Sequence, residues 1–185
     1  NQNWDFLLSK KLTGKIIFPQ SPRVLISIAK KIKAPNSLAK LKRQVKLFDD
    51  KNSLNWLINS DACVAIVPYN FSLEYSKIDP RLSIVFPNQG VPLTWFCVLN
   101  TSNFNSEMLT DWIKSLQSKE IAEKLAIRGW YLPFKNNNLS KIYNPEISNI
   151  SGPSQICWEN SWYFPLLSDS QKLKMENYWE DSLFP

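Results

Sequence analysis

The residues best placed to bind a small molecule are Ser21, Pro22 and Arg23, because a helix is expected to begin there. Serine is a favoured N-cap residue, and proline is common in the first helical turn. A helix start offers free backbone N–H groups at the positive end of the helix dipole, and a guanidinium can bind a carboxylate or phosphate through two hydrogen bonds. These residues favour an anionic or zwitterionic ligand. The alternative is that Ser21 only caps the helix and Arg23 points to solvent.

Residues for catalysis or metal binding are scarce. The chain has 185 residues and no histidine, which removes the commonest general base and the commonest zinc ligand. Its cysteines, Cys63, Cys97 and Cys157, are far apart, and the first two lie in apolar runs typical of buried thiols. No P-loop, dinucleotide-binding motif or nucleophile elbow occurs. We therefore expect no enzymatic activity, no catalytic residue, no metal ion and no cofactor.

Basic residues are concentrated in one stretch of a chain whose net charge is +6. With no acidic residue between them, this stretch contains Lys30, Lys31, Lys33, Lys40, Lys42, Arg43 and Lys46. The residues interleaved with them are largely apolar and include Ile32, Leu38, Leu41, Val45 and Leu47. Two interpretations stay open: a solvated face of two helices, or a basic nucleic-acid-binding domain. The first predicts only weak, salt-sensitive and non-specific binding to nucleic acid.

The first third of the chain alternates between short apolar runs and amphipathic stretches. Residues 15–18 and 63–67 are apolar runs typical of strands, and three helices are expected between them. Their expected first residues are Ser21, Ser37 and either Asp49 or Asp50. The second of these helices is expected to carry Leu38, Leu41, Val45 and Phe48. The alternation predicts an α/β fold with a largely parallel sheet flanked by helices.

Further along the chain, the pattern predicts a strand–turn–strand followed by helices. The expected strands cover residues 82–86 and 94–99, with a turn rich in proline, asparagine and glycine between them. A helical segment over residues 106–128 follows, with a new start at Ser118 and an end at Gly129. The remaining expected elements are a connecting loop over residues 135–152 and a helix over residues 169–179.

Four phrases of the sequence, in this order, resemble one known family. They are WDFLLSKKLTGKIIFPQSPRVL near the start, Pro68-Tyr69-Asn70 after a strand, the stretch from Phe86-Pro87 to Trp95, and the glycine–aromatic–proline turn from Gly129 to Pro133. Together they resemble the second half of an extracellular solute-binding protein of an ABC transporter, of the spermidine/putrescine-binding type. The resemblance covers nearly the whole chain.

The resemblance implies a periplasmic-binding-protein type II-like lobe, with a mixed sheet flanked by helices, as a fragment of a two-lobe clamshell. Residues 1–92 and 137–185 would form the second lobe, and residues 93–136 a crossing strand and helical pair of the first lobe. Such a protein captures a small solute in the periplasm and delivers it to the membrane permease of an importer. It has no specific nucleic-acid partner, and self-association of the fragment is also expected.

The family pattern places ligand contacts at Ser21, Arg23, Tyr69, Trp95 and Cys97. Polyamine binders hold the ligand with carboxylates, because a buried ammonium group needs a paired charge. The positions that match those carboxylates carry Ser21, Val24 and Cys97, none of which is acidic. The resemblance therefore implies a ligand other than a spermidine-like cation, or contacts from the part of the family fold that this chain does not match. Trp95 could instead be a core residue of its strand.

Overall fold

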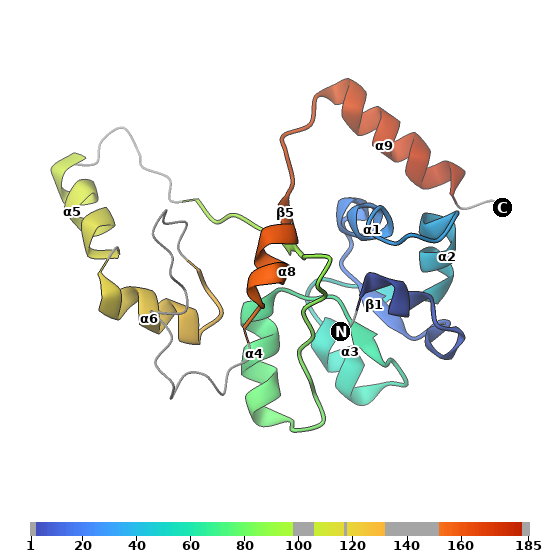
Figure 1. Cartoon of the computed structure of the whole chain (residues 1–185), viewed down its shortest axis with the longest axis horizontal. Helices are drawn as coiled ribbons and strands as arrows, with labels where there is room; N and C mark the ends of the chain where they lie inside the picture. Colours follow the sequence, from blue (N-terminus) through green and yellow to red (C-terminus); the bar gives the residue numbers. More distant parts are fainter. Residues whose placement is uncertain (1–2, 98–105, 117, 132–151, 183–185) are drawn as a thin grey trace. The chain divides into compact units, whose positions relative to one another are not determined.

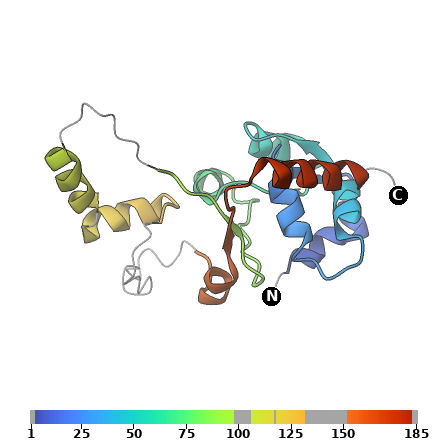
Figure 2. The same ribbon diagram turned by 90° about the horizontal axis from the view of Figure 1, so that it is seen from above.

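The computed structural model describes residues 3–97, 106–116, 118–131 and 152–182. The chain divides into two compact units. The first unit comprises Asn1–Pro68, Val85–Thr94 and Pro153–Pro185, and the second comprises Tyr69–Ile84 and Trp95–Gly152. Figures 1 and 2 show the ribbon in two perpendicular views.

A parallel sheet forms the centre of the first unit. Its strands are β1 (Ile16–Phe18), β2 (Val45–Phe48) and β3 (Val64–Ala65), in the order β2-β1-β3. Both neighbours pair parallel with β1, and all three residues of β1 are fully buried. A central strand covered on both faces reads as a continuous apolar run, as Ile16, Ile17 and Phe18 do. The structure confirms the predicted α/β class with parallel sheets flanked by helices.

Three α-helices connect these strands, as the alternating pattern predicts. They are α1 (Pro22–Ala29), α2 (Ser37–Gln44) and α3 (Ser53–Asn59). Two short 3-10 helices, Trp4–Leu8 and Lys10–Leu12, precede β1. The core gathers apolar side chains from these elements, among them Trp4, Leu7, Ile16, Phe18, Leu25, Ile28 and Leu41.

The prediction that Val45 and Phe48 lie on the second helix is wrong, because α2 ends at Gln44 and these residues form β2. Burial alternates along this strand, with Lys46 and Phe48 more exposed than Val45 and Leu47, and its backbone pairs with β1. The third helix begins at Ser53 instead of at Asp49 or Asp50. The Asp49 carboxylate accepts hydrogen bonds from the N–H groups of Lys51 and Asn52 and forms a turn before the helix.

The predicted strand–turn–strand is also wrong within the described residues. Residues 82–86 and 94–97 form no strand, and residues 98 and 99 lie outside the described part. The strand present is β4 (Pro92–Leu93), which pairs parallel with β5 (Trp162–Tyr163). Gly90 makes the turn before β4, with φ of +85°. The partner of β4 comes from a distant part of the sequence, and no local pattern reveals it.

Two helices of the last part of the chain complete the first unit. They are α8 (Gln155–Asn160) and α9 (Asp169–Asp181). Helix α9 confirms the predicted helix over residues 169–179, and it begins with a capping box between Ser168 and Gln171. Figures 1 and 2 both show α9, in red, beside α1 and α2. Of the predicted loop over residues 135–152, only the last residue lies within the described part.

The secondary-structure elements described in the second unit are helices. They are α4 (Tyr69–Ile78), α5 (Ser106–Leu116) and α6 (Lys119–Ile127). The Ser118 hydroxyl caps α6, and Gly129 follows it with φ of +78°, both as predicted. Residues 69–84 belong to this unit, although the predicted second lobe extends from residue 1 to residue 92. The assignment of the segments to the lobes of a clamshell stays a prediction.

Within the described residues, the helices are too short and too polar for any of them to cross a membrane.

Candidate functional site

Ser21 stands at the start of α1 but does not cap it with its side chain. It is the N-cap residue, with extended backbone dihedrals, and Pro22 occupies the first helical turn as predicted. The Ser21 side chain is exposed and makes no capping hydrogen bond, whereas its carbonyl oxygen accepts from the N–H of Val24 at 3.2 Å. Ser21 is thus the N-cap residue of α1 through its backbone, and its role in ligand binding stays a prediction.

The Arg23 side chain contacts the segment that follows β5. Its Nη2 atom donates a hydrogen bond to the carbonyl oxygen of Pro165 at 2.6 Å. Its guanidinium carbon lies 5.0 Å from the centroid of the Phe164 ring, within range of a cation–π contact. A guanidinium carries five N–H groups, so these contacts use only part of the donor capacity of Arg23.

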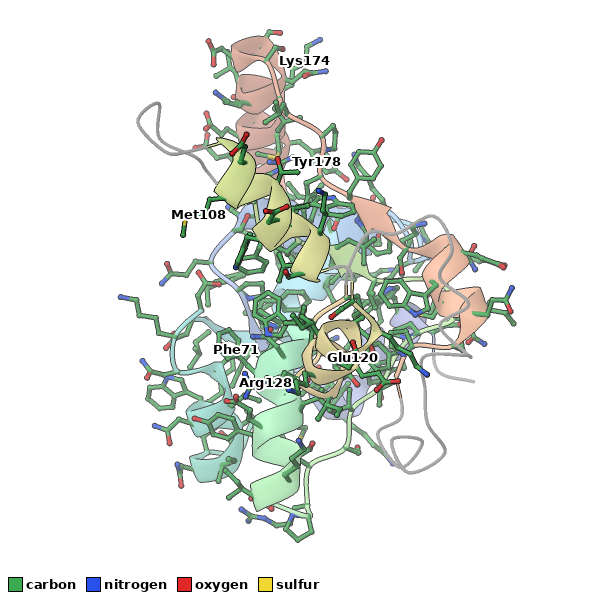
Figure 3. The ribbon with its side chains drawn as sticks, turned by 90° about the vertical axis from the view of Figure 1, so that its left-hand side faces the viewer. Phe71, Met108, Glu120, Arg128, Lys174 and Tyr178 are labelled. Carbon is green, nitrogen blue, oxygen red and sulfur yellow. The ribbon has the colours of Figure 1, made fainter. Side chains whose placement is uncertain are left out.

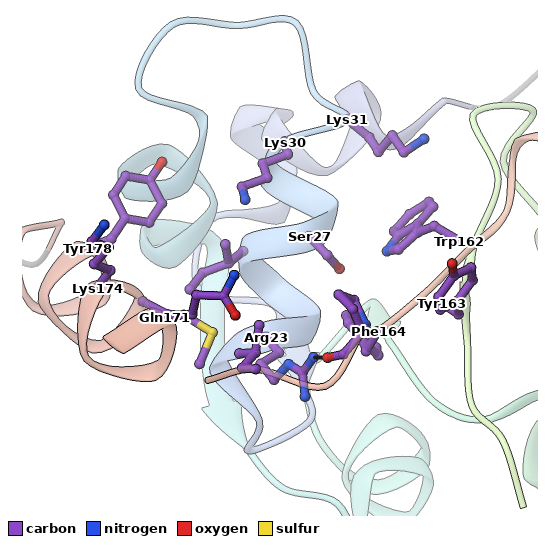
Figure 4. A pocket seen from close by; sticks show the side chains of 14 residues that line it. Arg23, Ser27, Lys30, Lys31, Trp162, Tyr163, Phe164, Gln171, Lys174 and Tyr178 are labelled. Atoms are coloured by element: carbon purple, nitrogen blue, oxygen red, sulfur yellow. Dashed lines mark hydrogen bonds between the residues drawn. The ribbon is translucent and has the colours of Figure 1, made fainter. Parts of the chain in front are cut away.

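A pocket of about 600 Å³ lies between α1, α9 and the segment of residues 162–167, all within the first unit. We call it the α1–α9 pocket, and Figure 4 shows it from close by. It is lined by Arg23, Ile26, Ser27, Lys30, Lys31, Trp162, Tyr163, Phe164, Pro165, Leu167, Gln171, Lys174, Met175 and Tyr178. This volume lies in the range of pockets that hold small molecules.

The α1–α9 pocket is basic. Arg23, Lys30, Lys31 and Lys174 line it, and none of its lining residues is acidic. The Lys31 ammonium lies 4.7 Å from the centroid of the Trp162 ring and donates to the carbonyl oxygen of Asn160 at 3.4 Å. Within the described part of the chain, the ammonium groups of Lys30 and Lys174 have no hydrogen-bond or ion-pair partner. The pocket therefore combines aromatic walls with uncompensated positive charge.

The other predicted ligand residues lie in the second unit. Tyr69 is the first residue of α4, and its ring stacks on that of Tyr131 with centroids 6.1 Å apart and an interplanar angle of 12°. Trp95 is 57% exposed, which rules out the alternative that it is a core residue. Cys97 is exposed as well. The exposed indole of Trp95 can serve as a flat apolar surface for a ligand.

The neighbours of these residues complete the local geometry of the second unit. Phe96 packs edge-on against Trp130, with ring centroids 4.6 Å apart. Met108 is 65% exposed and projects from α5 into solvent, as Figure 3 shows. The convergence of Ser21 and Arg23 with Tyr69, Trp95 and Cys97 on one cleft stays a prediction.

Val24, at one of the matched acidic positions, packs partly buried against the core of the first unit. A carboxylate there would lose hydration unless it were paired, so the apolar side chain suits this location.

Sequence reasoning missed most of the α1–α9 pocket. The signals that could have indicated it are the cations next to the end of α1 and the pair Lys174 and Tyr178. Because these two residues are four positions apart on α9, they share one helix face.

The basic stretch over residues 30–46 is largely a solvated surface, as one of the two interpretations predicts. Its exposed members are Lys30, Lys33, Lys40, Arg43 and Lys46. Three cations have partners within the first unit: Lys31 with Trp162, Lys42 with Trp179 and Lys46 with Asp61. The interleaved Ile32, Leu38 and Leu41 are buried. In the part of the chain that the structure describes, no cluster of acidic residues and cysteines could hold a metal ion.

The likeness to a solved protein concerns the fold. No protein-family model matches the chain, and no curated protein matches it. Among solved structures, the chain is similar to the crystal structure of an ABC transporter from Clostridium perfringens ATCC 13124, with a TM-score of 0.61 and 19% sequence identity. The similarity covers 98% of this chain and 61% of that chain. This chain therefore spans about three fifths of that protein's length and shares the fold of that part.

Proposed function

We propose that the protein is the substrate-binding component of an ABC importer and captures a small polar solute outside the cell membrane. The observation that carries the proposal is the match of 98% of the chain to the fold of an ABC transporter chain. The independent resemblance of four sequence phrases to solute-binding proteins of such transporters supports it. In this role the protein acts in the periplasm and its partner is the membrane permease.

The captured solute is proposed to be anionic or zwitterionic rather than a polyamine. Ser21, Val24 and Cys97 have no carboxylate in their side chains, so none of the three supplies the negative charge that an ammonium ligand needs. The start of α1 offers the opposite chemistry. It combines an exposed hydroxyl on Ser21, the positive end of a helix dipole and the guanidinium of Arg23 nearby.

Trp95, in the second unit, is proposed to provide an apolar surface for a ligand. More than half of its surface is exposed, at 57%. An indole ring offers a large rigid face for little loss of side-chain entropy on binding.

A thermal-shift screen tests the proposal. The protein is heated with polyamines, amino acids and small inorganic and organic anions, each at millimolar concentration. A ligand present at 100 times its Kd stabilises the folded state by about 2.7 kcal/mol, which shifts Tm by several degrees. We expect an anionic or zwitterionic compound to raise Tm.

Variants then locate the site. Arg23→Gln and Trp95→Ala are expected to reduce the shift, whereas Arg43→Gln, an exposed residue of α2, leaves it unchanged. If no compound of any class raises Tm, or if Arg43→Gln acts like Arg23→Gln, the proposal is wrong.

A further inference from the structure

We infer that the α1–α9 pocket is a binding site for a small aromatic anion. The pocket is complete within the first unit, so the inference holds whether or not the protein serves a transporter. Its volume of about 600 Å³ is large enough for one fused ring system with a carboxylate.

The lining of the α1–α9 pocket carries an excess of positive charge. Cations reach the pocket from two helices: Arg23, Lys30 and Lys31 from α1 and its end, and Lys174 from α9. Lys30 and Lys174 are exposed, and their ammonium groups have no acidic partner among the described residues. Like charges that face one pocket without a counter-charge repel each other, and an anion between them removes this repulsion. Figure 4 shows Lys30 extending from α1 toward α9.

Aromatic side chains form much of the pocket wall. Lys31 lies over the ring of Trp162 and Arg23 over the ring of Phe164, and these contacts hold both rings in position. Tyr178 on α9 is 50% exposed at the opposite side, and Met175 supplies a polarisable sulfur nearby. Aromatic rings favour offset or edge-on packing with another planar ring, and thioethers also pack well on rings. These walls favour the binding of a planar ring, and the lysines favour a negatively charged group on that ring.

Three naphthalene ligands that differ in the charge of their substituent test whether the pocket prefers an anion and a planar ring. The probes are 2-naphthoate, the neutral 2-naphthamide and the cationic 2-naphthylmethylamine, titrated calorimetrically at low ionic strength. We expect 2-naphthoate to bind about tenfold more tightly than the amide, because two uncompensated lysines contribute to the difference, and the amine to bind most weakly. Higher salt concentrations should reduce the advantage of the acid and leave the amide unchanged.

Matched variants assign the effect to the pocket. Lys30→Gln and Lys174→Gln are each expected to weaken naphthoate binding about two- to fivefold and leave the amide unaffected. Tyr178→Leu is expected to weaken both ligands. The controls are Lys172→Gln, which removes a lysine of α9 that pairs with Asp169, and Lys33→Gln; neither residue lines the pocket.

All these lysines are exposed, so the variants should unfold at the same temperature as the parent protein. The inference is wrong if none of the probes binds at millimolar concentration, if the three probes bind equally, or if the control variants weaken the acid as much as the pocket variants do. A failed solute screen combined with selective naphthoate binding that Trp95→Ala leaves unchanged would overturn the transport proposal alone, because Trp95 does not line the pocket. The reverse result would overturn the pocket alone.

Discussion

The ammonium nitrogen of Lys42 lies 3.6 Å from the centroid of the Trp179 indole ring and donates a hydrogen bond to the carbonyl oxygen of Trp179. The contact joins α2 to α9, and Phe48 of β2 packs edge-on against the same ring with centroids 5.9 Å apart. Burial lowers the pKa of Lys42 from its ordinary value, in keeping with an ammonium group partly removed from water. Helix α9 carries a wall of the α1–α9 pocket, so this contact also holds the pocket together.

Replacing Trp179 by alanine should loosen α9. The side chain is partly buried against the core, so we expect a loss of about 2 kcal/mol in the free energy of unfolding, below the cost for a fully buried aromatic residue. Urea denaturation measures it. Leu173→Ala on the same helix is the control, because Leu173 is 58% exposed and should cost less than about 0.5 kcal/mol. Equal costs for the two variants would show that Trp179 does not anchor the helix.

Comparing Gly90 with Gly14 separates the cost of an unfavourable φ from the cost of a steric clash. Both have positive φ, +85° and +67°, but a Cβ on Gly90 would lie 2.1 Å from the Asn160 carbonyl oxygen, whereas a Cβ on Gly14 has nothing within 4 Å. Gly14→Ala should cost about 1 kcal/mol from the dihedral alone, and Gly90→Ala about 3 kcal/mol or more because backbone must move. Chemical denaturation of both variants compares them. Similar losses would mean that β4 and α8 do not pack as closely as described.

The cysteines should differ in reactivity. Cys63 and Cys97 are exposed, which corrects the prediction that they are buried, whereas Cys157 is fully buried. Burial raises the pKa of the Cys157 thiol, more strongly than its hydrogen bond with Ser161 lowers it, so little thiolate forms. With a thiol-specific disulfide reagent at pH 8, we expect two thiols to react in the folded protein and the third only in denaturant. Rapid reaction of all three thiols in the folded protein would contradict the burial of Cys157.

Asp79 should titrate unusually low. The Arg81 side chain and backbone N–H both donate to its carboxylate, and these hydrogen bonds lower the pKa of Asp79 from 3.8 to about 2. A carboxylate with a lowered folded-state pKa stabilises the fold above the unfolded-state pKa. That stabilisation is lost as the pH falls through about 2. Carbon-detected NMR titration should show this midpoint, and Arg81→Gln should move it back toward 3.8. An unchanged midpoint in Arg81→Gln would contradict the assignment.

Elements with local signals were predictable from the sequence. Strand β1 is an uninterrupted apolar run, α1 begins with Ser21-Pro22, and α6 lies between a capping serine and Gly129. Each signal lies within a few residues, so the element could be recognised without knowledge of its tertiary partners. The fold class follows from the order of such elements, and this is why it was predicted correctly.

Elements made by distant pairing were not predictable. The two residues of β4 become a strand only because β5, much later in the chain, pairs with them. Strand β2 was assigned to a helix because Val45 and Phe48 continue the helical spacing of α2 until backbone pairing with β1 ends it. Tertiary pairing overrides local propensity in both cases.

Part of the candidate site could likewise be predicted from the sequence, and part could not. The positions of Ser21 and Arg23 at a helix start follow from local capping rules. The α1–α9 pocket needs α9 to pack across α1, and this packing depends on contacts such as that of Lys42 with Trp179. The spacing of residues in the sequence does not reveal such a contact. Lys174 and Tyr178 were therefore not predicted as pocket residues.

The most direct test of the central claim is a calorimetric titration of the protein with spermidine and with the anionic or zwitterionic compound that most raises its Tm. The account predicts no measurable heat of binding for spermidine, because the matched positions Ser21, Val24 and Cys97 carry no carboxylate. It predicts a Kd in the micromolar range, about −8 kcal/mol, for the other compound, and weaker binding by Arg23→Gln. Micromolar spermidine binding that is unaffected by Arg23→Gln would contradict the account.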